Sequence, residues 1–201
     1  MKYKIYKMLL SDVVQKYWNF ASIAHLNQFY TNHKDEKLPY INHIGSVVQE
    51  LYIFLLQTEN IYNIELAIGC AILHDTIEDT PFTHHDIENQ FGKKIADGVL
   101  ALTKNETIEN KKERMADSLR RINQQPKEIS LVKIADRIVN LQPPPKHWSL
   151  EKKEKYYEES KLIHKELSPS NTLLSNRLLE KIKNYTIYLN EVNPEKFPGL
   201  Y

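Results

Sequence analysis

The sequence has little that would indicate a secreted, disulfide-stabilised or membrane-spanning protein. Its single cysteine, Cys70, cannot form an intramolecular disulfide and lies in an apolar run, so a buried, inert thiol in a reducing compartment is expected. The longest apolar stretch, Ile64 to Leu73, is interrupted by Glu65 and Gly69 and is shorter than the roughly 20 residues of a membrane helix. No signal-type apolar segment follows the N-terminal lysines. We therefore expect a cytoplasmic protein without a membrane partner.

An excess of charge of one sign is also missing. The chain has 27 basic and 26 acidic residues, a formal net charge of +1. A strongly basic surface for nucleic acid is therefore not expected, and a small anionic substrate would need a local basic pocket. The sequence leaves the oligomeric state open, with a homodimer as one alternative.

Glycine is scarce, with five among 201 residues, and apolar positions recur at helical spacing. We expect an all-α, single-domain helical bundle of about eight to ten helices over residues 1–201. The motifs discussed below occupy a core at 21–178, and a C-terminal helix with an irregular tail is expected at 179–201. A chain of this length can bury roughly two-thirds of its unfolded surface.

Caps and breakers predict where the helices begin and end. Ser11 can cap a helix that extends to about Thr31, and residues 34–39 are expected to be a loop. Asn63 can cap a central helix that continues through His74 and Asp75. The other helices are expected at about 42–57, 83–92, 93–103, 111–124, 126–142, 150–166 and 168–191.

The most informative feature is the pair His74-Asp75, with His43 upstream and Asp136 downstream, all on segments expected to be helical. An apolar helix would not bury unpaired carboxylates, because isolated charge in the interior is costly. A divalent cation is the simplest compensation. Imidazole and carboxylate ligands without thiolate favour Mn²⁺, Mg²⁺ or Fe²⁺, with Zn²⁺ left open.

Two further carboxylates, Glu78 and Asp79, follow the His-Asp pair by one helical turn. A metal-bound water is a usable nucleophile near neutral pH, and a nearby carboxylate can orient it or protonate a leaving oxygen. We therefore predict a hydrolytic centre with Glu78 and Asp79 as catalytic residues.

The order of these residues resembles the HD superfamily of metal-dependent phosphohydrolases. The similarity is closer to the hydrolase domain of RelA/SpoT-type alarmone enzymes, especially the small stand-alone SpoT homologues. The matching stretches are His25–Gln28, Pro39–His43, His74–Thr80, Phe91–Gly92 and Lys133–Leu141, together with Trp148, Tyr156 and Asn171.

The resemblance implies Mn²⁺-dependent hydrolysis of the 3′-pyrophosphate of (p)ppGpp, giving GDP or GTP and pyrophosphate. In that family the positions of His43, His74, Asp75 and Asp136 bind the metal, and those of Glu78 and Asp79 form the catalytic acidic pair. Asn140 matches a nucleotide-contacting asparagine, and Tyr156 lies near a pocket tyrosine. His33 and Lys34 occupy the place of the family's Arg-Lys pair, so they are expected to contact substrate.

Two other functions stay open. One is an HD phosphohydrolase for another nucleotide, for example an NADPH 2′-phosphatase or a (p)ppApp hydrolase, since arginine and His33 are not equivalent at the base-packing position. The other is a non-catalytic nucleotide-binding or partner-binding module. Release of pyrophosphate rather than orthophosphate separates the enzymatic alternatives, and loss of a ligand or of the acidic pair would mark the module.

Overall fold

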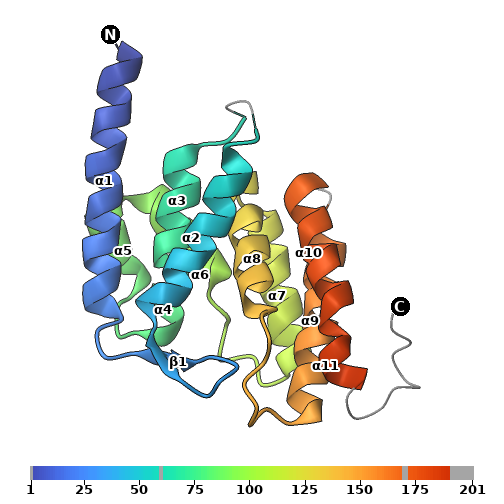
Figure 1. Ribbon diagram of the computed structural model, residues 1–201. Coiled ribbons are helices and arrows are strands. Elements are labelled where there is room, and N and C mark those ends of the chain that lie inside the picture. Colours follow the sequence, from blue (N-terminus) through green and yellow to red (C-terminus); the bar gives the residue numbers. More distant parts are fainter. Residues whose placement is uncertain (1, 59–60, 169–171, 191–201) are drawn as a thin grey trace.

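The computed structural model describes residues 2–58, 61–168 and 172–190, and Asn171 and the tail from 191 lie outside these ranges. In the described part, nine helices of eight or more residues and two of four residues form a bundle (Figure 1). The all-α prediction and the expected number of helices are confirmed. The elements are α1 (Lys2–Ala24), β1 (Phe29–Thr31), β2 (Lys37–Pro39), α2 (Ile41–Leu55), α3 (Ile64–Leu73), α4 (Thr76–Asp79), α5 (His84–Phe91), α6 (Lys93–Leu102), α7 (Lys111–Asn123), α8 (Lys127–Asn140), α9 (Leu150–Leu167), α10 (Thr172–Tyr185) and α11 (Ile187–Asn190).

Helix α3 is the central element of the bundle. Asn63 caps it by accepting a hydrogen bond from the Leu66 backbone, as expected, and every residue from Leu66 to Leu73 is buried. A helix that is apolar on all sides must be covered all round, and α3 packs against α1, α2, α6 and α8. Its C-terminal end therefore lies deep in the molecule, where it delivers His74.

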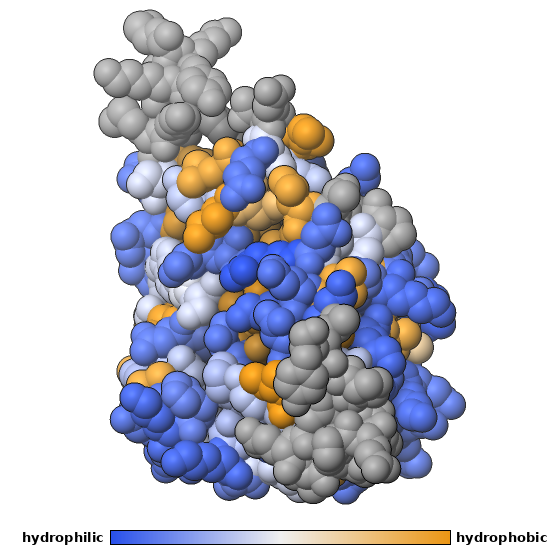
Figure 2. Space-filling view, turned by 45° about the vertical axis from the view of Figure 1, so that its right-hand side comes forward, coloured by the Kyte–Doolittle hydropathy of each residue, from blue (hydrophilic) through white to orange (hydrophobic). Residues whose placement is uncertain are grey.

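The outer surface is mainly polar. On the face shown in Figure 2, hydrophobic residues form a few small groups within a largely hydrophilic surface. None of the described helices is both long enough and apolar enough to cross a bilayer.

The first helix and the loop after it differ from the prediction. Helix α1 begins well before Ser11 and ends at Ala24, and an antiparallel hairpin of β1 and β2 replaces the last predicted turn and the predicted loop. Asn27 has a positive φ of 67°, the left-handed conformation that commonly follows a helix end. The Asn32 side chain then accepts hydrogen bonds from the backbones of Lys34 and Glu36 and closes the hairpin turn.

Two predicted helices are interrupted. Helix α3 stops at Leu73, because Asp75 has φ −100° and ψ 2° and the short α4 starts anew after it. His74 and Asp75 therefore lie at a junction rather than inside one helix. The long C-terminal helix is also divided, since the Thr186 hydroxyl bonds to the Lys183 carbonyl between α10 and α11.

Close approach of helices at Gly98 gives a stability prediction. A methyl group at this position in α6 would lie 2.7 Å from both Cys70 Sγ and Ile129 Cδ1. Gly98→Ala should therefore lower the free energy of unfolding by about 1–3 kcal/mol through overpacking. The matched control is Gly45→Ala in α2, where the nearest atom is a Trp18 ring carbon at 4.0 Å. There the gain in helix propensity should dominate, at up to ~1 kcal/mol. Urea unfolding of both variants measures this, and equal effects would contradict the packing argument.

Candidate active site

Three predicted metal ligands converge where α2, α3 and α8 pack together. His43 lies on α2, His74 at the end of α3 and Asp136 on α8, and one potential ligand atom from each lies within 4.8 Å of the others. The Nε2 atoms of His43 and His74 are 3.5 Å and 3.9 Å from Asp136 Oδ1. All three residues are buried. Side chains that are 31 to 93 positions apart in sequence thus share one centre.

The fourth predicted ligand, Asp75, borders this group. Its Oδ2 is 2.8 Å from His74 Nε2 and 3.9 Å from His43 Nε2. The same oxygen accepts a short hydrogen bond from the Tyr40 hydroxyl. The Tyr40 ring lies against His43, with 5.3 Å between ring centroids. The structure therefore brings all four predicted ligands together, with Asp75 oriented by Tyr40.

The geometry of His74 fits a metal ligand. Its Nδ1 donates to the Ala71 carbonyl at 2.9 Å, which leaves the lone pair of Nε2 directed toward the centre when the ring is neutral. Nε2 is buried and makes no hydrogen bond within the described structure, although Asp75 is near. Two imidazoles and two carboxylates without thiolate suit a divalent cation. The residues present thus fit the expected metal ion.

The electrostatics of the centre lead to the same conclusion. Burial alone would lower the pKa of His74, but Asp75 and Asp136 outweigh it and raise that pKa to about 9. Burial opposes ionisation of Asp136, yet Lys133 and the two imidazoles hold its pKa well below the usual value. The centre therefore keeps anionic carboxylates in a buried place and attracts positive charge, either protons or a cation.

Asp136 is fixed from both sides by its own helix. Lys133 Nζ lies 3.1 Å from one carboxylate oxygen, and the Asn140 amide donates to the other. Residues three before and four after Asp136 share its face of α8. Asn140, the predicted nucleotide contact, thus supports a predicted metal ligand and also lines the cavity described below.

The two predicted catalytic carboxylates have different surroundings. Glu78 accepts hydrogen bonds from Lys104 Nζ at 2.7 Å and from the Lys104 backbone at 2.9 Å, so it is held in place. Asp79 is exposed to the cavity and lies 3.5 Å from the Tyr40 hydroxyl. Desolvation, together with the charges of Asp75 and Glu78, raises the pKa of Asp79 to about 6. A carboxyl group whose pKa is raised by burial and neighbouring carboxylates is a candidate general acid.

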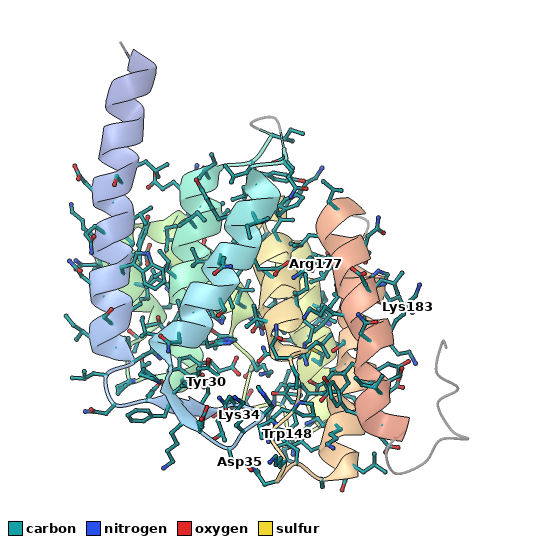
Figure 3. All side chains as sticks on the ribbon, in the orientation of Figure 1. Tyr30, Lys34, Asp35, Trp148, Arg177 and Lys183 are labelled. Carbon is teal, nitrogen blue, oxygen red and sulfur yellow. The ribbon has the colours of Figure 1, made fainter. Side chains whose placement is uncertain are left out.

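A cavity of about 1110 Å³ opens beside the metal ligands, between the hairpin, the segment from α6 to α7, and the α8–α9 side of the bundle. His33, Asn140 and Tyr156, three of the predicted substrate contacts, line the cavity, whereas the fourth, Lys34, is exposed on the hairpin turn and is not among the lining residues. Figure 3 shows Tyr30, Lys34, Asp35 and Trp148 at the same end of the molecule. His147 connects this region to the hairpin through a 3.0 Å contact with Asp35.

The cavity is also a local basic pocket of the kind that a small anionic substrate would need on a protein with almost no net charge. Seven lysine and arginine residues line it, although the whole chain has a net charge of +1. They are Lys104, Lys111, Arg114, Lys133, Arg137, Lys152 and Lys155. Sequence reasoning assigned none of them a site role. Lys133 shares a helix face with Asp136 and was detectable in principle, but nothing near Lys104 in sequence indicates its pairing with Glu78.

Removing one ligand should abolish metal binding. Asp136→Ala takes away the carboxylate shared by both histidines, and we expect loss of stoichiometric Mn²⁺ binding measured by calorimetry. Asp97→Ala, which removes a surface carboxylate paired with Lys93, is the control and should bind Mn²⁺ like the wild type. Unchanged stoichiometry in Asp136→Ala, with helicity intact by circular dichroism, would refute the ligand set.

The raised pKa of Asp79 predicts a pH effect on the metal-free protein. The pKa of Asp79 is about 6 in the folded state against an ordinary 3.8. At pH values between these two, the folded protein therefore keeps a proton that the unfolded chain has released. The associated stability is complete below the unfolded pKa and is lost as pH rises through the folded pKa. Asp79→Asn should flatten the fall in melting temperature between about pH 4 and pH 7. An identical slope in variant and wild type would count against this environment.

The sequence of this chain is similar to those of several known proteins. The chain is 33% identical over 165 residues to guanosine-3′,5′-bis(diphosphate) 3′-pyrophosphohydrolase MESH1 of Danio rerio, covering 80% of this chain and 87% of that protein. The corresponding human protein is 31% identical over 170 residues, 82% and 90% of the two chains. The bifunctional (p)ppGpp synthase/hydrolase SpoT of Escherichia coli is 32% identical over 145 residues, which are 66% of this chain and 20% of that one.

Solved structures share the fold. A structure described as a metazoan ortholog of SpoT that hydrolyzes ppGpp superposes with a TM-score of 0.73 at 24% identity, covering 86% of this chain and 94% of the other. The protein lmo0812 of Listeria monocytogenes has a TM-score of 0.58 at 20% identity, covering 73% and 97%. The sequence profile of the HD domain matches residues 18–171. The chain therefore belongs to the HD-domain family, and its similarity to the small SpoT-like proteins confirms the resemblance inferred from its motifs.

Proposed function

We propose that this protein hydrolyses the 3′-pyrophosphate of (p)ppGpp, releasing pyrophosphate and GDP or GTP, with Mn²⁺ as the first candidate for the metal. One observation supports this above all: the cluster of His43, His74, Asp75 and Asp136 adjoins both an acidic pair and a basic cavity. The names of the MESH1 relatives support the choice of substrate. All six predicted metal and catalytic residues are present, which argues against a non-catalytic module.

The positions of the cations suit a nucleotide with phosphates at two sites. One group comes from the segment between α6 and α7 and the start of α7: Lys104, Lys111 and Arg114. The other comes from α8 and α9: Arg137, Lys152 and Lys155. A nucleoside with phosphate groups on both its 3′ and 5′ oxygens can engage both groups at once. A ligand with a single phosphate can use only one of them.

The two residues of the acidic pair have different tasks: Asp79 transfers a proton, and Glu78 holds the cavity wall in position. A divalent ion held by the four ligands would supply a polarised water and offset charge on the phosphoryl oxygens. In the reaction, water attacks phosphorus, and the bond from phosphorus to the ribose 3′ oxygen breaks. Asp79, whose pKa is about 6, retains enough of the protonated form near neutrality to donate its proton to that oxygen. Glu78 and Lys104 form a rigid pair that fixes the wall beside Asp79.

Product analysis tests the reaction. The protein is incubated with Mn²⁺ and a panel of ppGpp, pppGpp, ppApp and NADPH, and pyrophosphate and orthophosphate are assayed separately. We expect pyrophosphate from the guanosine compounds. Orthophosphate from NADPH as the dominant product would support the 2′-phosphatase alternative instead, and absence of turnover with every compound would reject an enzymatic role of this kind.

Variants of the acidic pair test the mechanism. Glu78→Gln should keep the bound metal and reduce turnover by about 10²-fold, the loss expected when a carboxylate of an acid–base pair is removed. Lys93→Met removes a comparable surface ion pair with Asp97 and is the control, with activity expected at the wild-type level. Full activity in Glu78→Gln would assign Glu78 a structural role only.

A further inference from the structure

The last turn of α6 lies against the guanidinium of Arg121, which belongs to the next helix, α7. Arg121 Nη1 donates to the Leu100 carbonyl at 2.6 Å and to the Ala101 carbonyl at 3.3 Å. Arg121 Nη2 donates to the Thr103 carbonyl at 2.7 Å. The last carbonyl groups of a helix have no partner within the helix, and a cation near them is favourable. One side chain of α7 therefore fixes the backbone where α6 ends.

Arg121 is held in this position by Asp117, one turn earlier on α7. Its Nε donates to Asp117 Oδ2 at 2.8 Å, and this hydrogen bond is the main cause that holds the pKa of Asp117 below its ordinary value. Arg120 also pairs with Asp117, but its side chain is 68% exposed against 27% for Arg121. Within the described residues, Arg120 has no hydrogen bond to α6. The two neighbouring arginines thus share one carboxylate, and of the two only Arg121 connects it to α6.

The peptide group between Thr103 and Lys104 connects this arginine to the acidic pair. Its carbonyl oxygen accepts from Arg121 at 2.7 Å, and its N–H donates to Glu78 Oε2 at 2.9 Å. Because a peptide group is planar and rigid, a guanidinium that fixes the carbonyl also fixes the direction of the N–H. A peptide oxygen that accepts from a cation also polarises the group, which strengthens the N–H as a donor. Arg121 and Glu78 are therefore joined through a single peptide group.

Both oxygens of the Glu78 carboxylate are bound by the residue that follows this carbonyl. Oε2 accepts from the Lys104 N–H, and Oε1 accepts from Lys104 Nζ at 2.7 Å. Glu78 lies on α4, a helix of four residues, which is too short to be stable without tertiary contacts. The position of Glu78, next to Asp79, therefore depends on where the end of α6 is held.

Arg121 does not itself face the substrate cavity. The described residues that line the cavity include Arg114 of the same helix but not Arg121. Arg121 therefore lies behind the cavity wall and does not bind a phosphate group there. An exposed ion pair alone contributes little to stability, whereas hydrogen bonds to three backbone carbonyls define a geometry. These contacts indicate that Arg121 acts through the segment that it holds.

We propose that Arg121 is a positioning residue for the reaction: through the Thr103–Lys104 peptide group it holds Glu78 and Lys104 in place beside Asp79. The assignment rests on the proposed function, because it assumes that the pair of Glu78 and Lys104 takes part in hydrolysis. Its structural part concerns the backbone of Lys104 and is measured without turnover.

Hydrogen exchange tests the structural part. The exchange rate of the Lys104 amide is measured by mass spectrometry on the Mn²⁺-loaded wild type, Arg121→Met and Arg120→Met. Arg121→Met should exchange this amide at least about 10-fold faster, since the charged hydrogen bond that fixes the peptide is lost. Arg120→Met removes the more exposed arginine from the same carboxylate and should exchange like the wild type. Arg121→Lys keeps the charge but not the planar guanidinium, and its rate should lie between those of Arg121→Met and the wild type.

Kinetics test the role in the reaction. With ppGpp and Mn²⁺, Arg121→Met should lower kcat by about 10-fold, as a small displacement of reacting groups does, and should change KM less because Arg121 does not line the cavity. Arg120→Met should have the kcat of the wild type. In a Glu78→Gln background, Arg121→Met should lower kcat little further, because the residue through which it acts is already changed.

The double variant distinguishes positioning from damage to the fold, since a general distortion would lower kcat equally in both backgrounds. That result, or an unchanged Lys104 exchange rate in Arg121→Met, would overturn the assignment. Pyrophosphate release that Arg121→Met leaves unchanged would reject only the role of Arg121. Faster Lys104 exchange in Arg121→Met, combined with no pyrophosphate release by the wild type, would support the contact with the Glu78 segment and reject only the proposed reaction.

Discussion

Buried negative charge at the junction of α2, α3 and α8 is the constraint on which the rest of the structure depends. Asp75 and Asp136 lie next to two buried imidazoles, in surroundings made mainly of apolar residues. Such a group is stable only with compensating positive charge and complete hydrogen bonding. Lys133 contacts the Asp136 oxygen that is not shared with the imidazoles, whereas Asn140 and Tyr40 donate to the Asp136 and Asp75 oxygens that lie next to them. These two oxygens and the two imidazole Nε2 atoms lie close together, and a divalent cation would complete this arrangement.

The break after Leu73 lets a helix that is apolar from Leu66 onward end in a polar site. The buried residues of α3 anchor the helix, and the change of direction at Asp75 allows α4 to start separately. Glu78 then reaches Lys104 beyond the end of α6, while Asp79 faces the cavity. A continuous helix, as the sequence pattern suggested, would not have an independent turn to place these two carboxylates. The irregularity at His74-Asp75 thus connects the candidate metal ligands to the acidic pair.

The sequence was sufficient to identify three of the candidate metal ligands because their signal is local. A polar cluster in an apolar helix violates the hydrophobic pattern, and this makes His74, Asp75 and Asp136 visible without a structure. The roles of Tyr40 and Lys104 depend on contacts over 35 and 26 positions, with no accompanying periodicity. The hairpin was missed because its strands are three residues each, too short for a period of two to show. The exposed position of Lys34 follows from that hairpin turn.

Near-neutral overall charge has a consequence for recognition. With a net charge of +1, the whole molecule exerts little long-range attraction on an anionic nucleotide, and salt screens surface charges beyond about 8–10 Å. The choice of substrate must then depend on contacts inside the cavity, where cations and carboxylates occupy different places. Carboxylates beside the imidazoles favour a metal, and the carboxylate with the raised pKa suits proton transfer. The same functional group thus suits two tasks, and its partners decide which.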